Sequence, residues 1–134
     1  MSEIINPQDA ELEEIILGSC LIESKAITLI ADILRPEAFY NEKNLEIYAT
    51  LQSMYRNGQK IDIITVKEEL ARRGKLEFIG GPYTLAHISG RVASSAHLEY
   101  HARILKQKYI RRETILGFLS LIHISEPTRR TPIS

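Results

Sequence analysis

Two histidines four residues apart, His97 and His101, are the first candidates for chemistry in this sequence. On a helix this spacing places both imidazoles on one face, where they could share one metal ion. The zinc motif of helical metalloproteases has a glutamate directly after its first histidine, but Leu98 occupies that position here. Because the sequence suggests no third ligand nearby, we predict surface or packing histidines and no metal site.

Glycines and carboxylates offer two further candidate sites. The Gly-Gly-Pro turn at residues 80–82 would hold a phosphate only if a Lys-Ser or Lys-Thr pair opened the next helix, and no GxxxxGK[ST] motif occurs. Glu11, Glu13 and Glu14 fall near the start of a predicted helix, where solvent-exposed carboxylates stabilise the positive end of its dipole. We therefore predict no catalytic residue and no bound cofactor, ATP and Mg²⁺ included.

Basic residues crowd the last predicted helix, beside Leu105 and Tyr109. These basic residues are Arg103, Lys106, Lys108, Arg111 and Arg112. One interpretation is a row of phosphate contacts along DNA. The other is a helix that packs its apolar side on a partner subunit while its basic side meets acidic residues. Since the chain has zero net charge and no aromatic platform for bases, we favour the protein interface.

The candidate interface on this helix combines apolar and basic side chains. Its members are Leu98, Ala102, Arg103, Leu105, Lys106, Lys108, Tyr109, Arg111 and Arg112. The apolar members, continued by Leu116, form a stripe at helical spacing that leaves one face to be buried. We expect the chain to self-associate through this face, as a mixture of monomers and dimers rather than a hexamer.

The charge distribution, the single cysteine and the length of the apolar runs limit the classes of protein to which this chain can belong. The 17 basic and 17 acidic residues cancel, but the charge is −7 over residues 1–50 and +7 over residues 51–134. This polarity indicates complementary contacts between subunits, one basic face, or merely solvated faces. Cys20 is the single cysteine, so no disulfide framework is expected. An acidic N-terminus and the lack of a membrane-length apolar run predict a cytoplasmic protein without membrane contact.

The elements that position these residues are predicted to be helices. A central helix spans residues 41–58, where Asn41 is the N-cap, Gly58 ends the helix, and apolar residues recur at steps of three and four. A first helix begins at Pro7 and carries Gly18 within its apolar stripe, which indicates close packing.

Further helices complete an all-α domain. They are expected over residues 25–34, 65–74 and 82–90, and from residue 95 onward. Thr65 and Glu68 are the predicted capping box of one of them. The predicted architecture is a compact bundle of about six helices.

The last 16 residues differ from the rest. Residues 119–134 contain two prolines and an apolar run without a polar face. We therefore predict a domain over residues 1–118 and a disordered tail over residues 119–134. The string from Leu119 to Arg129 resembles the translated read-through of a sequencing-library adapter, which would make the tail non-native; a genuine disordered tail is the alternative.

Six short segments follow one another in a specific order and spacing. They are PQDAELEEIILG (7–18), LRPEAFY (34–40), IY (47–48), IDIITVKEEL (61–70), GKLEFIGGPYTL (74–85) and EYHARILKQKYIRR (99–112). Each is weak alone, but the series resembles the N-terminal domain of the DnaB family of replicative DNA helicases. The resemblance covers residues 6–118. Asn44 stands where the family usually has histidine, and His97 where asparagine is common.

The resemblance implies a helical bundle that ends in a helical hairpin, of which this chain holds the first helix only. In that family the domain pairs into dimers, three dimers form a collar on a hexameric ring, and the collar engages primase and helicase-loader proteins. A separate C-terminal domain binds ATP and moves on single-stranded DNA, and it is absent here. The resemblance thus implies a scaffold module for DNA replication, not an enzyme by itself. A helical DNA-binding module that uses the basic last helix is the alternative.

Overall fold

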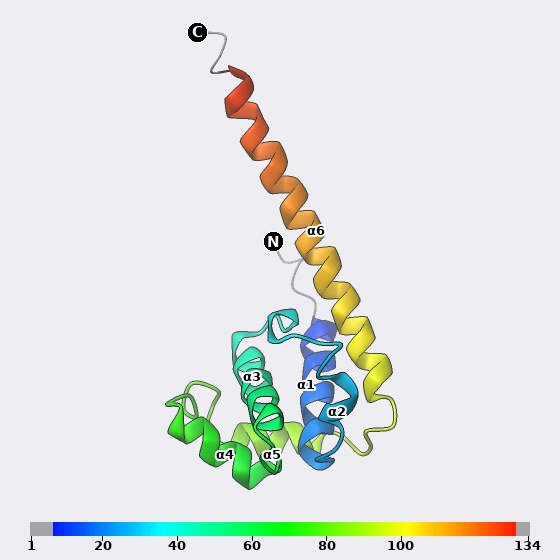
Figure 1. The fold of residues 1–134 in the computed structure, drawn as a ribbon, viewed down its shortest axis with the longest axis vertical. Helices are drawn as coiled ribbons and strands as arrows, with labels where there is room; N and C mark the ends of the chain where they lie inside the picture. Colours follow the sequence, from blue (N-terminus) through cyan, green and yellow to red (C-terminus); the bar gives the residue numbers. More distant parts are fainter. Residues whose placement is uncertain (1–6, 131–134) are drawn as a thin grey trace.

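The described part of the chain is built from helices alone. The computed structural model describes the backbone of residues 7–130 and the side chains of residues 9–121. Figure 1 shows α1 to α5 gathered into a rounded body, from which one long helix, α6, projects. Within the described residues there is no strand. The prediction of an all-α fold of about six helices is therefore confirmed.

The helices pack around α1 and α3, so that each of the others contacts at least one of these two. In chain order the elements are α1 (Pro7–Ile22), α2 (Ile27–Ile30), the 3₁₀ turn η1 (Pro36–Ala38), α3 (Glu42–Arg56), α4 (Ile63–Arg72), α5 (Pro82–Gly90) and α6 (Leu98–Arg130). α1 packs against α3, α5 and α6, and α2 contacts both α3 and α6. α4 and α5 close the end of the body that lies opposite the projecting part of α6 (Figure 1).

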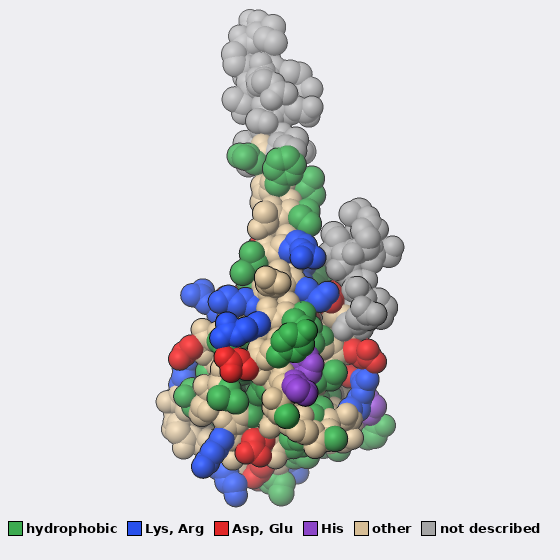
Figure 2. Space-filling view, turned by 90° about the vertical axis from the view of Figure 1, so that its right-hand side faces the viewer, with side chains coloured by type: hydrophobic (Ala, Val, Ile, Leu, Met, Phe, Trp, Pro, Cys, Tyr) green, Lys and Arg blue, Asp and Glu red, His purple; other side chains and the backbone are tan. Residues whose placement is uncertain are grey.

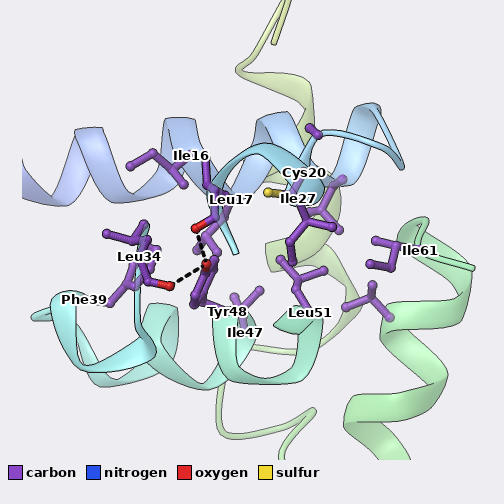
Figure 3. Packing of buried hydrophobic residues seen from close by; sticks show 14 of the residues in the cluster. Ile16, Leu17, Cys20, Ile27, Leu34, Phe39, Ile47, Tyr48, Leu51 and Ile61 are labelled. Carbon is purple, nitrogen blue, oxygen red and sulfur yellow. Dashed lines mark hydrogen bonds between the residues drawn. The ribbon is translucent and has the colours of Figure 1, made fainter. Parts of the chain in front are cut away.

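The core is centred on Tyr48 of α3, which is completely buried. Its ring stacks on Phe39 with the ring centroids 4.8 Å apart. Its hydroxyl donates hydrogen bonds to the carbonyl oxygens of Leu34, at 2.9 Å, and Ile30, at 3.5 Å (Figure 3). These bonds satisfy the one polar atom of the ring, and burial raises the pKa of the hydroxyl so that it stays a donor. Tyr48 thereby joins α3 to α2 and the segment that follows it.

The ends of two helices test the predicted caps. Asn41 caps α3 as predicted, because its side chain accepts hydrogen bonds from the N–H groups of Lys43 and Asn44. The predicted capping box of α4 is wrong: Asp62 is the N-cap, and Thr65 is its reciprocal partner in the third helical position. Aspartate caps a helix at least as well as threonine, so the helix begins one turn earlier than expected.

Gly18 lies at a close contact between α1 and the end of α5. A Cβ atom at this position would lie 2.6 Å from the carbonyl oxygen of Ile88 and 2.5 Å from Cγ2 of Val92. The first of these neighbours is backbone, which cannot move aside without shifting α5. The predicted role of Gly18 in close helix packing is therefore confirmed.

α6 is much longer than the sequence pattern predicted. It continues to Arg130, although the sequence shows no helical pattern after Phe118, and residues 131–134 lie outside the described part. A helix that is already formed adds one hydrogen bond for each residue, so a lost amphipathic pattern does not by itself end it. No helix among the described residues has the length and apolar character needed to cross a bilayer. The domain boundary at residue 118 and the disordered tail over residues 119–134 stay predictions.

The contact at Gly18 predicts the effect of a single methyl group. Gly18→Ala should lower the free energy of unfolding by about 1–3 kcal/mol, since overpacking outweighs the gain in helix propensity of about 1 kcal/mol. Gly117→Ala is the matched control, because nothing lies within 4 Å of a Cβ at Gly117. Urea unfolding should show that the control is at least as stable as the wild type. Equal stability of the two alanine variants would contradict the packing role.

Candidate interaction surface

The apolar residues of the predicted interface are not available to a partner. Leu98, Ala102 and Leu105 are each exposed by 1% or less, and all three belong to the core of the body. Their assignment to a free interface is wrong. The physical reason is that the first turns of α6 lie on α1 and α2, so the apolar stripe covers the chain's own core.

Three of the predicted basic residues also contact their own chain. The Lys108 ammonium lies 3.0 Å from the carboxylate of Asp9 on α1. Arg103 pairs with Glu99 one turn earlier at 2.9 Å. The third, Arg112, is half-buried beside Tyr40, which precedes α3, and Tyr109, which lies on α6. Lys106 and Arg111 are exposed. Figure 2 shows a belt of basic side chains at the base of the projecting helix.

Arg112 lies against two aromatic rings. Its guanidinium carbon is 5.1 Å from the ring centroid of Tyr40 and 5.6 Å from that of Tyr109. Both distances fall within the range of cation–π attraction. Tyr109, also predicted for the interface, is half-buried and packs against the core. Arg112 and Tyr109 therefore belong to the junction between α6 and the body.

The exposed apolar surface of α6 lies beyond Arg112, C-terminal to most of the predicted interface. Every side chain of residues 113–121 is exposed. The large apolar residues among them are each 45–65% exposed to solvent: Ile115, Leu116, Phe118, Leu119 and Leu121. Figure 2 shows these hydrophobic side chains on the projecting stem, above the basic belt. We call residues 113–121 the free segment. In the sequence, the free segment can be recognised by its apolar residues and by the absence of any charged residue from 114 to 121.

The apolar side chains of the free segment surround the helix. Successive residues turn by 100° on a helix, so Leu116 continues the line of Leu105 and Tyr109, whereas Phe118 lies on nearly the opposite side. A helix that is apolar on all sides is normally buried among other helices. The free segment therefore has the character of an interface, and more than one side of it can be covered.

The glutamates of α1 have separate structural roles. Glu11 and Glu14 both form ion pairs with Arg91, just after α5, which links the two helices. Glu13 is only 1% exposed, so the prediction that it faces solvent near the helix dipole is wrong. Three donors from the start of α3 surround its carboxylate, and these contacts hold the side chain inward.

The Glu13 carboxylate joins α1 to the beginning of α3. It accepts hydrogen bonds from the backbone N–H of Tyr40 at 2.6 Å and of Asn41 at 3.4 Å, and from Nδ2 of Asn44 at 2.9 Å. Burial raises the pKa of this carboxyl above its ordinary value of 4.5, while the hydrogen bonds and the charge of Arg112 act in the opposite direction. The site is polar, enclosed and filled by the chain's own groups, which suits a structural link.

The histidine pair sits at the start of α6. The ring centroids of His97 and His101 are 6.3 Å apart, and the ring of Tyr100 lies 5.7 Å from that of His101. Burial and the neighbouring His97 lower the pKa of His101. Among the described residues, no group of three or more His, Cys, Asp or Glu side chains is arranged to hold a metal ion. The pair offers two imidazoles at most.

Comparisons with known proteins find similarity to replicative DNA helicases of the DnaB type. A family model described as the DnaB-like helicase N-terminal domain matches residues 5–107. The replicative DNA helicase DnaB of Rhodothermus marinus is 43% identical over 108 residues, which cover 81% of this chain but only 12% of that protein. The chain thus spans about an eighth of the length of this relative. The match to the family model ends within α6, before the free segment.

Solved structures share the fold as well. The crystal structure of the N-terminal domain of DnaB helicase from Mycobacterium tuberculosis has a TM-score of 0.82 and 32% identity, covering 87% of this chain and 85% of that one. A structure described as a DnaB-like replicative helicase and its interactions with primase has a TM-score of 0.73 and 31% identity. This chain is covered to 84% in that comparison, and the other chain to 26%.

The buried Glu13 carboxyl predicts a pH dependence of stability. Because its pKa is raised in the folded protein, the folded state binds the proton more tightly than the unfolded state. The free energy of unfolding of the wild type, relative to Glu13→Gln, should therefore fall as the pH rises above about 4.5, and should level off above the folded pKa. Urea unfolding of both proteins from pH 4 to pH 8 measures this difference. A difference that grows with pH would show that the hydrogen bonds outweigh burial.

Proposed function

The chain belongs to the DnaB-like helicase N-terminal domain family, and we propose that it is the association module of a replicative DNA helicase. In this proposal it holds subunits together in DNA replication and contributes no chemistry of its own. The single observation that carries the proposal is the part of the free segment that precedes residue 119, where the large apolar residues Ile115, Leu116 and Phe118 are 45–61% exposed. An exposed apolar surface of this kind marks a protein interface.

The partner we propose for the free segment is a second copy of this chain. Two copies of α6 placed side by side would cover Phe118 and Ile115, which are three residues apart and share one side of the helix, with equally apolar surface from the other copy, as a two-fold interface requires. The unequal charge of the two halves of the sequence, −7 and +7, also favours contact between copies. In the full-length protein, the same contact would contribute to a larger ring.

Primase and a helicase loader are the further partners that we propose. The support for primase is the similarity to the structure described as a DnaB-like replicative helicase and its interactions with primase. The loader rests on the family resemblance alone. We also propose that the parent protein acts in the cytoplasm and that ATP-driven unwinding belongs to a domain outside the residues of this chain, since the chain spans 12% of its Rhodothermus marinus relative.

We propose that this chain by itself neither binds nor hydrolyses ATP. The support is the sequence, which contains no GxxxxGK[ST] loop to hold the phosphates. The Gly80–Gly81 turn precedes α5, but Pro82 opens that helix where a phosphate loop needs lysine and serine or threonine. Thermal unfolding with and without Mg-ATP tests this directly. A nucleotide-dependent rise in Tm, beyond that given by an inert salt of equal ionic strength, would contradict it.

A DNA-binding role for the basic part of α6 is the second candidate. The structure weakens its electrostatic basis, because Lys108 and Arg103 form ion pairs within the chain and Arg112 packs on two tyrosines. Lys106 and Arg111 remain exposed. If they bind phosphates, Lys106→Gln with Arg111→Gln should weaken binding of a single-stranded oligonucleotide and reduce its salt dependence. If association is the function, the same double variant should leave the oligomeric state unchanged.

The association proposal predicts a specific loss in one variant. Phe118→Glu should weaken dimerisation by about 3 kcal/mol or more, roughly a hundredfold in Kd, because each dimer would contain two charged replacements of a buried aromatic ring. Sedimentation velocity from low to high micromolar concentration measures the change. Tyr83→Glu is the matched control, because Tyr83 is a 76% exposed aromatic residue on α5, away from α6.

Three outcomes would decide the question. Concentration-dependent association that is lost in Phe118→Glu and kept in Tyr83→Glu supports the proposal. A wild type that is strictly monomeric over the whole range contradicts it. So does loss of association in Tyr83→Glu alone, since the interface would then lie on the body. We use Phe118 rather than Tyr109 for the disrupting variant because Tyr109 packs against the core.

A further inference from the structure

The place where α6 leaves the body is sharply defined. Up to Arg112 the helix alternates between buried and exposed side chains, whereas from residue 113 to residue 121 every side chain is exposed. The last contacts before the exit are the ion pair of Lys108 with Asp9 and the packing of Arg112 on the rings of Tyr40 and Tyr109. Arg112 is thus the final residue at which the described part of α6 touches the body.

Tyr40, the ring on which Arg112 rests, is itself held firmly. The preceding residue, Phe39, is 1% exposed and stacks on Tyr48 at the centre of the core. The backbone N–H of Tyr40 donates to the buried carboxylate of Glu13 at 2.6 Å. The following residue, Asn41, is the N-cap of α3. The backbone at position 40 is therefore fixed on both sides, which places the Tyr40 ring, 42% exposed, at the foot of the free segment.

We propose that Arg112, resting on Tyr40, is a brace that sets the direction in which the free part of α6 leaves the body. A planar guanidinium on an aromatic face fixes both the distance and the orientation of the two groups, which a flexible ammonium does not. Through Tyr40 and Glu13, the brace connects α6 to both α3 and α1. Arg112 is a positioning residue in this scheme, since it acts on a partner only through the helix.

The geometry of the helix amplifies any change at the brace. The helix continues from residue 113 to Arg130, a length of about 27 Å at 1.5 Å per residue. A tilt of about 10° at Arg112 would therefore move its far end by about 5 Å. If two copies associate through the free segment, this tilt sets the angle between their bodies. That consequence rests on the proposed function, but the brace itself does not.

The brace is tested by a distance within one chain. Spin labels at Arg56→Cys, exposed at the end of α3, and Ser120→Cys, exposed on the free segment, report the direction of α6 relative to the body. The native Cys20 does not compete for the label, because it is completely buried and burial raises the pKa of its thiol to about 12. An excess of unlabelled protein keeps distances between chains out of the measurement by double electron–electron resonance.

The expected result is a shifted or broader distance distribution in Arg112→Leu and in Tyr40→Leu. Arg111→Leu, which removes the exposed neighbouring charge, is the matched control and should keep the wild-type distribution. Far-UV circular dichroism confirms that each variant retains its helices, and Arg112→Gln replaces Arg112→Leu if the latter does not fold. Wild-type distributions in folded Arg112 and Tyr40 variants would overturn the brace.

The same variants separate the brace from the proposed association. Failure of the brace would appear as an unchanged distance within the chain, whatever the oligomeric state. Failure of the association proposal would appear as a monomeric wild type, whatever the distance distribution. If both are correct, Arg112→Leu should still form dimers in sedimentation, and the dimer should have a changed sedimentation coefficient because its bodies lie at a different angle.

Discussion

Burial of the first half of α6 on α1 and α2 is the interaction on which the rest of the structure depends. Leu98, Ala102 and Leu105 complete the core, and this contact fixes the helix to the body over its first turns. The same helix then continues without support into an apolar segment. A packed first half and an exposed apolar end within one continuous helix suit the proposed association module, because the body would then carry the proposed docking surface at a defined position.

A buried carboxylate is the second constraint. Placing Glu13 inside the body is unfavourable unless its oxygens accept hydrogen bonds, and the start of α3 supplies three donors. This arrangement makes the position of Tyr40 depend on α1 as well as on α3. Since Arg112 packs on Tyr40, a polar contact deep in the body also influences how the exposed part of α6 is held.

Local sequence signals found most of the helices, but they missed the true cap of α4, the full length of α6 and the packing partners of individual side chains. The cap at Asn41 and the close contact at Gly18 follow from residue type and position, and both predictions are confirmed. Helical spacing also found the stripe that begins at Leu98, but spacing cannot tell whether a stripe covers its own body or another chain. The inward direction of Glu13 was equally invisible, because its donors come from residues 40–44, which are distant in sequence.

Amide hydrogen exchange along α6, measured at low and high protein concentration, tests the central claim most directly. The account predicts that amides of residues 98–112 exchange slowly at every concentration, because this half of the helix is packed on the body. Amides of the free segment should exchange quickly in dilute protein and become protected as the concentration rises. Protection of the free segment that is equal at all concentrations, or absent at all of them, would contradict the account.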